Sequence, residues 1–249
     1  MTDFVWEAGA LTDQGCRRSH NEDSILSLPD DGIFIVADGM GGHAAGDVAS
    51  RMVTDAIAEM ETVGSFPTLI DRFDDCMIDI NRRIRRHADE HFGGRTMGCT
   101  LVAMLASGGV GVCMWAGDSR LYLVRDGEMK QISRDHDPLE ELVESGALTP
   151  EQADEHPDSS VITRAVGGQP DLYLDIIAFD VQPRDVFLLC SDGLYREVLR
   201  DEIHQILGNE EPVERTAQAL MNLALERGAR DNVSVIVARC LETVEDEGS

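Results

Sequence analysis

Apolar residues recur with a helical period in three stretches of the chain. At residues 47–61, 67–91 and 213–227 they return every three or four positions, which predicts helices with one buried face. The third stretch ends before Gly228, a residue that commonly terminates helices because it accepts a left-handed backbone. Arginines gather toward the end of the second stretch, where positive charge suits the helix dipole: Arg82, Arg83, Arg85 and Arg86.

Short runs of β-branched and apolar residues predict strands over much of the remaining chain. They cover residues 24–28, 32–37, 99–106, 110–116, 120–124, 172–179, 186–190 and 233–239. Asp126-Gly127 separates two runs and predicts a tight hairpin. Because two helices follow one another between strands, the order differs from that of an alternating parallel sheet. We therefore expect an α+β fold with two packed, mainly antiparallel sheets and helices on their outer faces.

A polar segment at residues 133–163 interrupts this pattern. It is rich in Asp, Glu, Ser and Pro, and Asp137-Pro138 and Thr149-Pro150 are typical of helix starts. Most polar insertions merely connect strands, yet this length also suits a lid or recognition flap. We expect one domain over residues 1–241 that includes this flap, followed by a disordered acidic tail at residues 242–249.

The charge of the chain limits its partners. Its 249 residues include 47 acidic and 21 basic ones, a formal net charge of −26. We expect no binding to nucleic acid or to an anionic membrane, since both require a basic surface. No stretch approaches the roughly 20 apolar residues of a membrane helix, and the N-terminus lacks the pattern of a signal peptide. The cysteines form no Cys-x-x-Cys pair, so we expect reduced thiols in a cytoplasmic protein.

Carboxylates stand beside several apolar runs, where an isolated charge is costly unless it is paired or bound to a metal. They come from remote positions: Glu22, Asp23, Asp38, Asp118, Asp192 and Asp231. Any one of them is more typical of a turn than of a ligand, because Asp-Gly is common in turns. As a set around a dense sheet, they predict a site for Mg²⁺ or Mn²⁺, which prefer oxygen ligands.

Other catalytic patterns fit less well. Cys190 and Arg196 have the Cys-x5-Arg spacing of cysteine phosphatases. However, Cys190 lies in an apolar strand pattern, and the Asp192 between them is accounted for as a metal ligand. Ser191 lacks the Gly-x-Ser-x-Gly pattern of a nucleophile elbow and is read as a turn residue.

Ordered motifs across the chain resemble those of the metal-dependent PPM-type (protein phosphatase 2C-like) serine/threonine protein phosphatases, with the bacterial branch as the best fit. From about residue 4 to 239 they read RSHNED, VADGMGGHAAGDVAS, GCTLVAML, WAGDSRLYLVRDG, ITRAVG, LLCSDGL and RDNVSVIVAR. The resemblance implies an α/β/β/α sandwich. It also implies hydrolysis of phosphoserine and phosphothreonine by a hydroxide that bridges two metal ions, with no covalent phosphoenzyme.

The resemblance implies a role for each motif residue. Asp38 should bridge two Mn²⁺ or Mg²⁺ ions, and the Gly39 carbonyl should bind one of them. Asp192 and Asp231 should complete the other ion. Glu22 should bind directly or through water. Two metals that share a water lower its pKa and present it to phosphorus, which agrees with these roles.

Further residues are implied around this pair of ions. Asp118 with Asp192 resembles the third-metal site of bacterial relatives, so two or three ions are expected. Arg18 matches the phosphate-binding arginine, whose planar fork suits phosphoryl oxygens, and Arg17 is the solvated alternative. Met40 stands where eukaryotic relatives carry a histidine, which leaves the general acid open. Three residues are candidates for supporting groups or for this acid: Asp23, His43 and Asn232.

The resemblance implies phosphorylated protein substrates and a Ser/Thr kinase whose action is reversed. We expect a monomer, and the flap is the candidate for substrate selection. Two alternatives are open: a phosphatase dedicated to one regulatory partner of anti-anti-sigma type, and a catalytically idle phosphoprotein-binding module. The complete set of carboxylates disfavours the idle module, because degenerate members would be expected to lose metal ligands.

Overall fold

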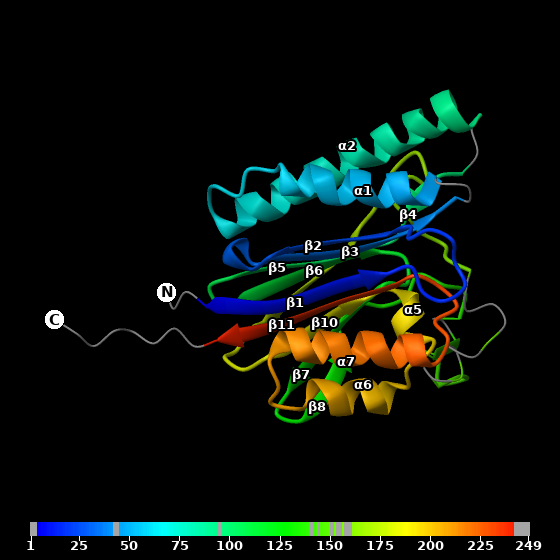
Figure 1. Ribbon diagram of the computed structural model, residues 1–249. Helices are drawn as coiled ribbons and strands as arrows, with labels where there is room; N and C mark the ends of the chain where they lie inside the picture. Colours follow the sequence, from blue (N-terminus) through cyan, green and yellow to red (C-terminus); the bar gives the residue numbers. More distant parts are fainter. Residues whose placement is uncertain are drawn as a thin grey trace.

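The layers of the fold follow from the two sheets. The computed structural model describes residues 4–41, 45–93, 96–139, 142–143, 145–149, 152, 156 and 161–241. Within them, two antiparallel sheets lie face to face and helices cover both outer faces (Figure 1). This helix, sheet, sheet, helix order confirms the expected α+β fold. None of the described helices combines the length and the apolar character that crossing a membrane requires.

The first sheet joins strands from both ends of the chain. Its order is β1-β11-β10-β7-β8, with antiparallel neighbours throughout. Its members are β1 (Val5–Asp13), β7 (Arg120–Arg125), β8 (Glu128–Gln131), β10 (Val186–Cys190) and β11 (Val233–Leu241). Asp126 and Gly127 connect β7 to β8 with φ angles of 52° and 78°, which confirms the predicted hairpin.

The second sheet has the order β2-β3-β5-β6-β9, and the short β4 pairs with the far end of β3. Its members are β2 (Asp23–Leu28), β3 (Ile33–Met40), β4 (Gly98–Cys99), β5 (Leu101–Ser107), β6 (Val110–Ala116) and β9 (Asp175–Asp180). The 3-10 turn η1 (Pro29–Asp31) connects β2 to β3. Because β4 pairs with Gly39 and Met40, β3 continues past its apolar run and carries Asp38 within the strand.

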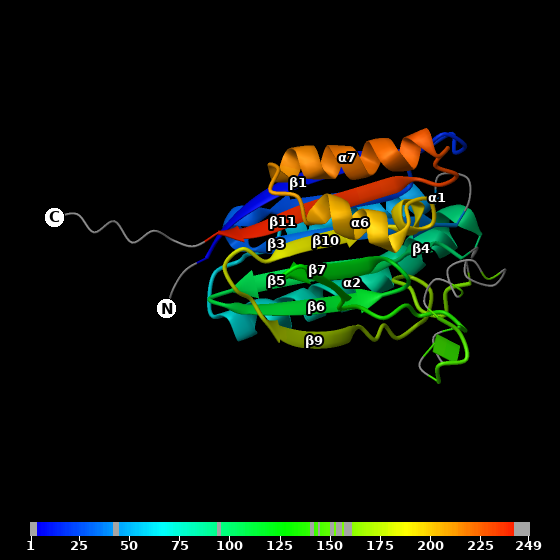
Figure 2. The same ribbon diagram turned by 90° about the horizontal axis from the view of Figure 1, so that it is seen from below.

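Helices cover the two outer faces as the sequence predicted. On the second sheet lie α1 (Ala45–Ala58) and α2 (Phe66–Phe92), and on the first lie α6 (Arg200–Leu207) and α7 (Val213–Glu226). Figure 2, seen from the side of α6 and α7, shows these two helices over β11 and β10. The short α5 (Asp192–Tyr195) follows β10 directly.

Aromatic and aliphatic side chains fill the space between the sheets. Phe34, Phe187 and Ile236 are fully buried there. The ring of Trp6 lies 5.6 Å from that of Phe34 and 5.7 Å from that of Phe187, measured between centroids. Residues from both sheets therefore form one core, which fixes how the ends of the strands align.

The structure corrects the sequence prediction at four elements. The strand expected at 172–179 begins only at Asp175, because Leu172 and Leu174 pack against the core beneath α2 without strand pairing. The prediction also omitted α5, α6 and β1. In β1 the side chains near its centre are small, since a Cβ on Gly9 would lie 2.6 Å from the Val213 oxygen of α7. Small residues weaken the β-branched signal that predicts strands.

The two ends of the proposed flap are held together. The Thr163 amide donates to the His136 oxygen at 2.7 Å, and the His136 amide donates to the Gly117 oxygen at 3.0 Å. Thr149 and Gln152 exchange side-chain to backbone hydrogen bonds of 2.8 and 3.2 Å, the contacts of a capping box, whereas most of the expected helix lies outside the described residues. Much of residues 140–160 lies outside the described residues, so the flap's role and the domain limits stay predictions.

Candidate active site

The predicted site residues meet at one end of the sandwich. In Figure 1 this end lies at the right, beside β4 and α5, away from the start of β1 and the end of β11. A pocket of about 280 Å³ opens between β3, the β6–β7 turn, the start of α5 and the loops before β2 and β11. The predicted metal ligands and the predicted phosphate-binding arginine line it together: Arg18, Glu22, Asp38, Gly39, Asp118, Asp192 and Asp231.

Thr100 holds the backbone of Asp38 from both sides. Its hydroxyl accepts a hydrogen bond from the main-chain amide of Asp38 at 3.0 Å. Its own main-chain amide donates to the main-chain oxygen of Asp38 at 2.8 Å. The Thr100 hydroxyl also lies 2.7 Å from the Ser119 hydroxyl of the next turn. Sequence reasoning missed both hydroxyls, although a threonine within the apolar run GCTLVAML is a detectable signal. Thr100 therefore fixes the backbone position from which the Asp38 side chain extends into the pocket.

Gly39 lies where no side chain fits. A Cβ there would lie 2.3 Å from the main-chain oxygen of Gly46 and 2.4 Å from that of Glu22. The Gly39 amide donates a hydrogen bond to the same main-chain oxygen of Glu22 at 3.1 Å. The close approach brings β3, the start of α1 and the loop of Glu22 together.

Gly39→Ala should therefore disrupt the pocket. Forcing the backbones apart should cost about 1–3 kcal/mol of stability. It should also lower turnover by about 100-fold, the effect expected of a displacement of about 1 Å in a site. Thermal unfolding and phosphopeptide hydrolysis measure the two effects. The matched control is Gly208→Ala, whose φ of −75° suits alanine; equal effects of the two changes would contradict the prediction.

Asn232 anchors the loop that carries Glu22. Its side-chain oxygen accepts from the Glu22 amide at 2.8 Å. Its side-chain nitrogen donates to the Gln14 and His20 oxygens at 2.8 and 2.9 Å. Asn232 is buried, so these bonds are shielded from water. The residue supports Glu22 and lies outside the lining of the pocket.

Asp23 lies behind the pocket, beside Asp38 in the β2–β3 pair. One of its oxygens, Oδ2, accepts hydrogen bonds from the hydroxyls of Ser191 at 2.8 Å and Ser234 at 2.7 Å. Burial raises the pKa of Asp23 to about 7, against the opposing effect of these hydrogen bonds. The side chain connects β2 to β10 and β11, which makes it a supporting group.

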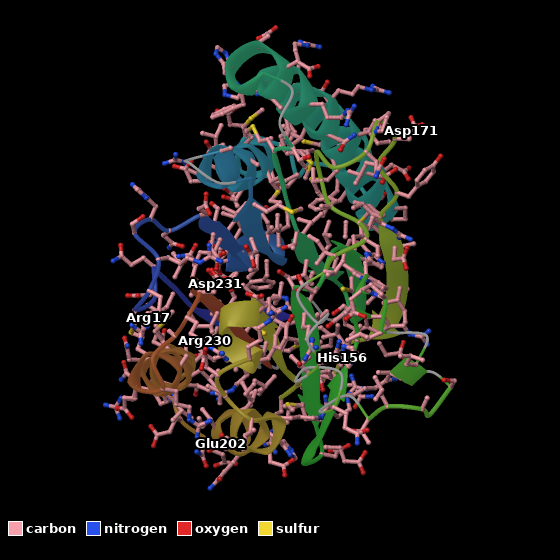
Figure 3. The ribbon with its side chains drawn as sticks, turned by 90° about the vertical axis from the view of Figure 1, so that its right-hand side faces the viewer. Arg17, His156, Asp171, Glu202, Arg230 and Asp231 are labelled. Atoms are coloured by element: carbon pink, nitrogen blue, oxygen red, sulfur yellow. The ribbon has the colours of Figure 1, made fainter. Side chains whose placement is uncertain are left out.

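Two arginines pair with the carboxylates of the pocket. Arg18 Nη2 lies 2.6 Å from Asp231 Oδ2. Arg196 lies 2.9 Å from Asp192 through Nε and 3.4 Å from Asp118 through Nη2. Figure 3 faces this end of the molecule.

The same view separates the two candidate arginines of the N-terminal loop. Arg17 is labelled toward the outer edge of Figure 3, and Asp231, the partner of Arg18, lies nearer the middle. Arg18 lines the pocket. The geometry therefore favours Arg18 over Arg17 as the arginine that faces a substrate.

The buried carboxylates require positive charge. Burial, followed by the charges of Asp23 and Asp192, raises the pKa of Asp38 well above its ordinary value. Burial and Asp192 likewise raise the pKa of Asp118 to about 7. Asp192 Oδ1 is buried without a hydrogen-bond partner among the described residues. Mg²⁺ and Mn²⁺ prefer oxygen ligands. The unsatisfied oxygen of Asp192 and the neighbouring carboxylates together offer such ligands.

The donor types thus fit divalent ions, whereas the described side chains do not form a ready-made ion site. Among the described residues, no group of three or more Asp, Glu, His or Cys side chains is arranged to hold an ion. Asp231 instead pairs with Arg18, and Asp192 with Arg196. Ion binding at this pocket would therefore involve rearrangement of carboxylate side chains.

Cys190 and His43 were the remaining candidates for catalytic groups. Cys190 is fully buried, and burial raises the pKa of its thiol far above the ordinary value, which excludes a thiolate nucleophile at neutral pH. All the cysteines are free, as expected, with Cys16 exposed. His43 lies outside the described residues, so its candidacy as an acid stays a prediction.

Known proteins are similar to this chain in sequence and in fold. Residues 16–237 match the family described as protein phosphatase 2C. The chain is 38% identical over 235 residues to the serine/threonine protein phosphatase PstP of Mycobacterium tuberculosis, a match that spans 94% of this chain and 45% of that protein. It therefore covers about half the length of this mycobacterial relative. Over 233 residues it is 34% identical to the serine/threonine phosphatase stp of Listeria innocua, covering 91% of this chain and 92% of that protein.

A solved structure shows the same arrangement. The catalytic domain of a serine/threonine protein phosphatase PstP, in complex with two manganese ions, superposes with a TM-score of 0.87. It is 35% identical, and the match covers 96% of this chain and 100% of that one. Fold and sequence identity agree over nearly the full length, and the chain belongs to the protein phosphatase 2C family.

Proposed function

We propose that this chain is a serine/threonine protein phosphatase that hydrolyses phosphoserine and phosphothreonine in proteins. The supporting observation is the pocket in which carboxylates from five separate segments face two arginines, Arg18 and Arg196. Relatives that match over nearly the whole described chain carry the name serine/threonine phosphatase. Enclosed acidic residues beside arginine suit a metal-assisted reaction of a phosphate ester.

The proposal includes two divalent ions, because the PstP catalytic domain binds two manganese ions and this pocket offers oxygen donors. Asp38 would hold both ions, with the Gly39 oxygen, Asp192, Asp231 and Glu22 as further donors. Bound there, the ions would supply the Lewis acidity that activates water and would offset the charge of the phosphoryl group.

The residues of the chain would bind and orient the substrate. Arg18 lies at the pocket wall with its guanidinium 2.6 Å from Asp231 Oδ2, so it can present paired N–H donors to phosphoryl oxygens beside the ions. Its side chain is about half exposed, which leaves room for a substrate to approach. Thr100 and Asn232 hold Asp38 and Glu22 from behind. Their hydrogen bonds preorganise the carboxylates before substrate arrives.

The proposed substrates are phosphorylated proteins in the cytoplasm, and the proposed activity opposes a Ser/Thr kinase. A net charge of −26 would repel acidic phosphopeptides, so local positive charge from Arg18 and the ions is needed for their approach. Residues 133–163 remain the proposed element for substrate selection.

Phosphate release from a phosphothreonine peptide tests the proposal. Hydrolysis should rise from background with added Mn²⁺ or Mg²⁺ and return to background with EDTA. Activity that survives chelation would rule out the metal mechanism. Tight binding of the phosphopeptide without turnover at saturating Mn²⁺ would favour the idle binding module. Turnover of one phosphoprotein alone from a panel would favour the dedicated phosphatase.

A further inference from the structure

Arg196 lies between the two carboxylates that the family resemblance assigns to a third ion. Its Nε is 2.9 Å from Asp192 Oδ2, and its Nη2 is 3.4 Å from Asp118 Oδ2. The side chain is 22% exposed, against 13% for Asp192 and 6% for Asp118. The Nε contact is an ion pair without hydrogen-bond geometry, and the Nη2 contact is a long hydrogen bond. In a partly dry pocket both carboxylates still attract the guanidinium, because water screens these charges poorly.

The backbone builds this arrangement in. Arg196 follows α5 and lies four residues after Asp192, so its side chain reaches back over one helical turn. Its main-chain amide also donates to the main-chain oxygen of Asp192 at 3.0 Å. The same residue therefore binds Asp192 through both its main chain and its side chain.

The turn that carries Asp118 is held against α5 by a second contact. The Tyr195 hydroxyl donates to the Asp118 main-chain oxygen at 3.1 Å. The Arg120 guanidinium lies over the Tyr195 ring, 3.6 Å from its centroid, which is a cation–π distance. Neighbouring residues, Tyr195 and Arg196, thus fix the main chain and the carboxylate of Asp118 in front of α5.

We propose that Arg196 takes the place of a third metal ion, so that this phosphatase binds two ions and uses Asp118 as the partner of an arginine. The inference rests on the proposed function, since it concerns the ions of the same site. A divalent ion lies about 2.0–2.3 Å from its carboxylate oxygens. An ion between Asp118 and Asp192 would therefore have to displace the guanidinium that already binds them, and two neighbouring cations would repel each other.

The two oxygens of Asp192 then have different roles. Oδ2 binds Arg196, and Oδ1 is buried without a hydrogen-bond partner among the described residues. The free oxygen is the one available to the ion pair held with Asp38. Arg196 is thereby a positioning residue, because it acts on the ions through the orientation of Asp192.

Counting bound ions tests this role without reliance on activity. Equilibrium dialysis against Mn²⁺, followed by metal analysis, should find two ions per wild-type chain and still two in Asp118→Asn. Arg196→Met frees both carboxylates, so it should bind a third, weaker ion. The double variant Arg196→Met with Asp118→Asn should return to two. Arg196→Lys keeps the positive charge and should also remain at two.

A matched control and the contradicting outcomes complete the test. Arg230→Met removes another arginine at this end, one that pairs with Glu197 at 2.8 Å, and should leave two ions. Three ions in the wild type, reduced to two by Asp118→Asn, would overturn the inference while supporting the proposed phosphatase. Two ions in a folded Arg196→Met would also overturn it, with folding checked by thermal unfolding. No bound ion in the wild type would overturn both proposals.

Discussion

Asp38→Asn is expected to abolish phosphopeptide hydrolysis while leaving the metal-free protein at least as stable as the wild type. The carboxylate is proposed to hold both ions, and even the loss of a group that only supports a ligand costs about 10–100-fold in activity or metal affinity. Loss of the bridging ligand should lower activity by more than that factor. Phosphate release at saturating Mn²⁺ measures the effect.

The stability half of this prediction follows from burial. Burial, with the nearby charges of Asp23 and Asp192, raises the folded-state pKa of Asp38 well above its unfolded value. Ionised Asp38 therefore destabilises the folded chain as pH rises above the unfolded-state pKa, and at neutral pH this cost is present. A neutral asparagine of the same shape removes it. In EDTA the thermal midpoint of Asp38→Asn should equal or exceed that of the wild type.

Added Mn²⁺ should make the wild type more thermally stable than Asp38→Asn. Ions that bind only the folded state stabilise it, so Mn²⁺ should raise the wild-type midpoint and leave that of Asp38→Asn nearly unchanged. The matched control is Asp126→Asn in the exposed β7–β8 hairpin, where φ is 52° and asparagine is well tolerated. It should keep full activity and the full Mn²⁺ response. An Asp38→Asn protein that loses stability in EDTA and activity together would indicate a structural role instead.

Asp38 also illustrates how much of the site could be predicted from the sequence. A buried strand is readable as an apolar run, and a carboxylate at its end stands out because its burial is costly. The same argument found Asp192 after β10 and Asp231 before β11. The family resemblance supplied the order of these motifs and the role of Arg18, which apolar runs alone do not give.

The contacts that hold these groups could not be predicted in the same way. Thr100, between β4 and β5, binds Asp38 of β3, and Asn232 binds Glu22 over a separation of 210 residues. Arg196 shows the limit most clearly, since its spacing from Cys190 matched a cysteine phosphatase loop while its side chain in fact pairs with Asp118 and Asp192. Most of these partners are distant in sequence and meet only in the folded chain, so a local pattern does not reveal them. The contact of Arg196 with Asp192 is local but was hidden by the competing cysteine phosphatase spacing.

The fold was predictable to a similar extent. The helices α1, α2 and α7 and the central strands were found because each has one buried face and a clear period. The missed elements are short, as α5 is, or built of small residues, as β1 is near Gly9. Leu172 and Leu174 show the opposite error, because partly buried apolar residues in a segment without strand pairing were read as a strand.

The second large effect is expected at Arg120, which forms the most buried ion pair of this region. Its guanidinium donates to Asp135 from Nε at 3.1 and 2.9 Å and from Nη2 at 2.6 Å. Nη1 donates to the Tyr122 hydroxyl at 3.1 Å. The side chains of Arg120 and Asp135 are only 10% and 6% exposed. Bidentate pairing in a dry setting makes each partner depend on the other.

Arg120→Met should lower the free energy of unfolding by about 3–5 kcal/mol, because it leaves the Asp135 carboxylate buried without its guanidinium partner. Gln131, whose side-chain nitrogen donates to Asp135 at 3.0 Å, cannot replace a positive charge. Urea unfolding of the metal-free protein measures the change through its midpoint. Arg230→Met removes the exposed partner of Glu197 and should cost at most about 1 kcal/mol.

A second substitution separates charge from packing at this pair. If the cost of Arg120→Met comes from the carboxylate left behind, Arg120→Met combined with Asp135→Leu should recover most of the lost stability, since apolar replacement of a buried ion pair is often neutral. If it comes from lost packing over the Tyr195 ring, the double variant should be no more stable than the single one. A single variant as stable as Arg230→Met would contradict both accounts. The ion pair would then contribute little to stability despite its burial.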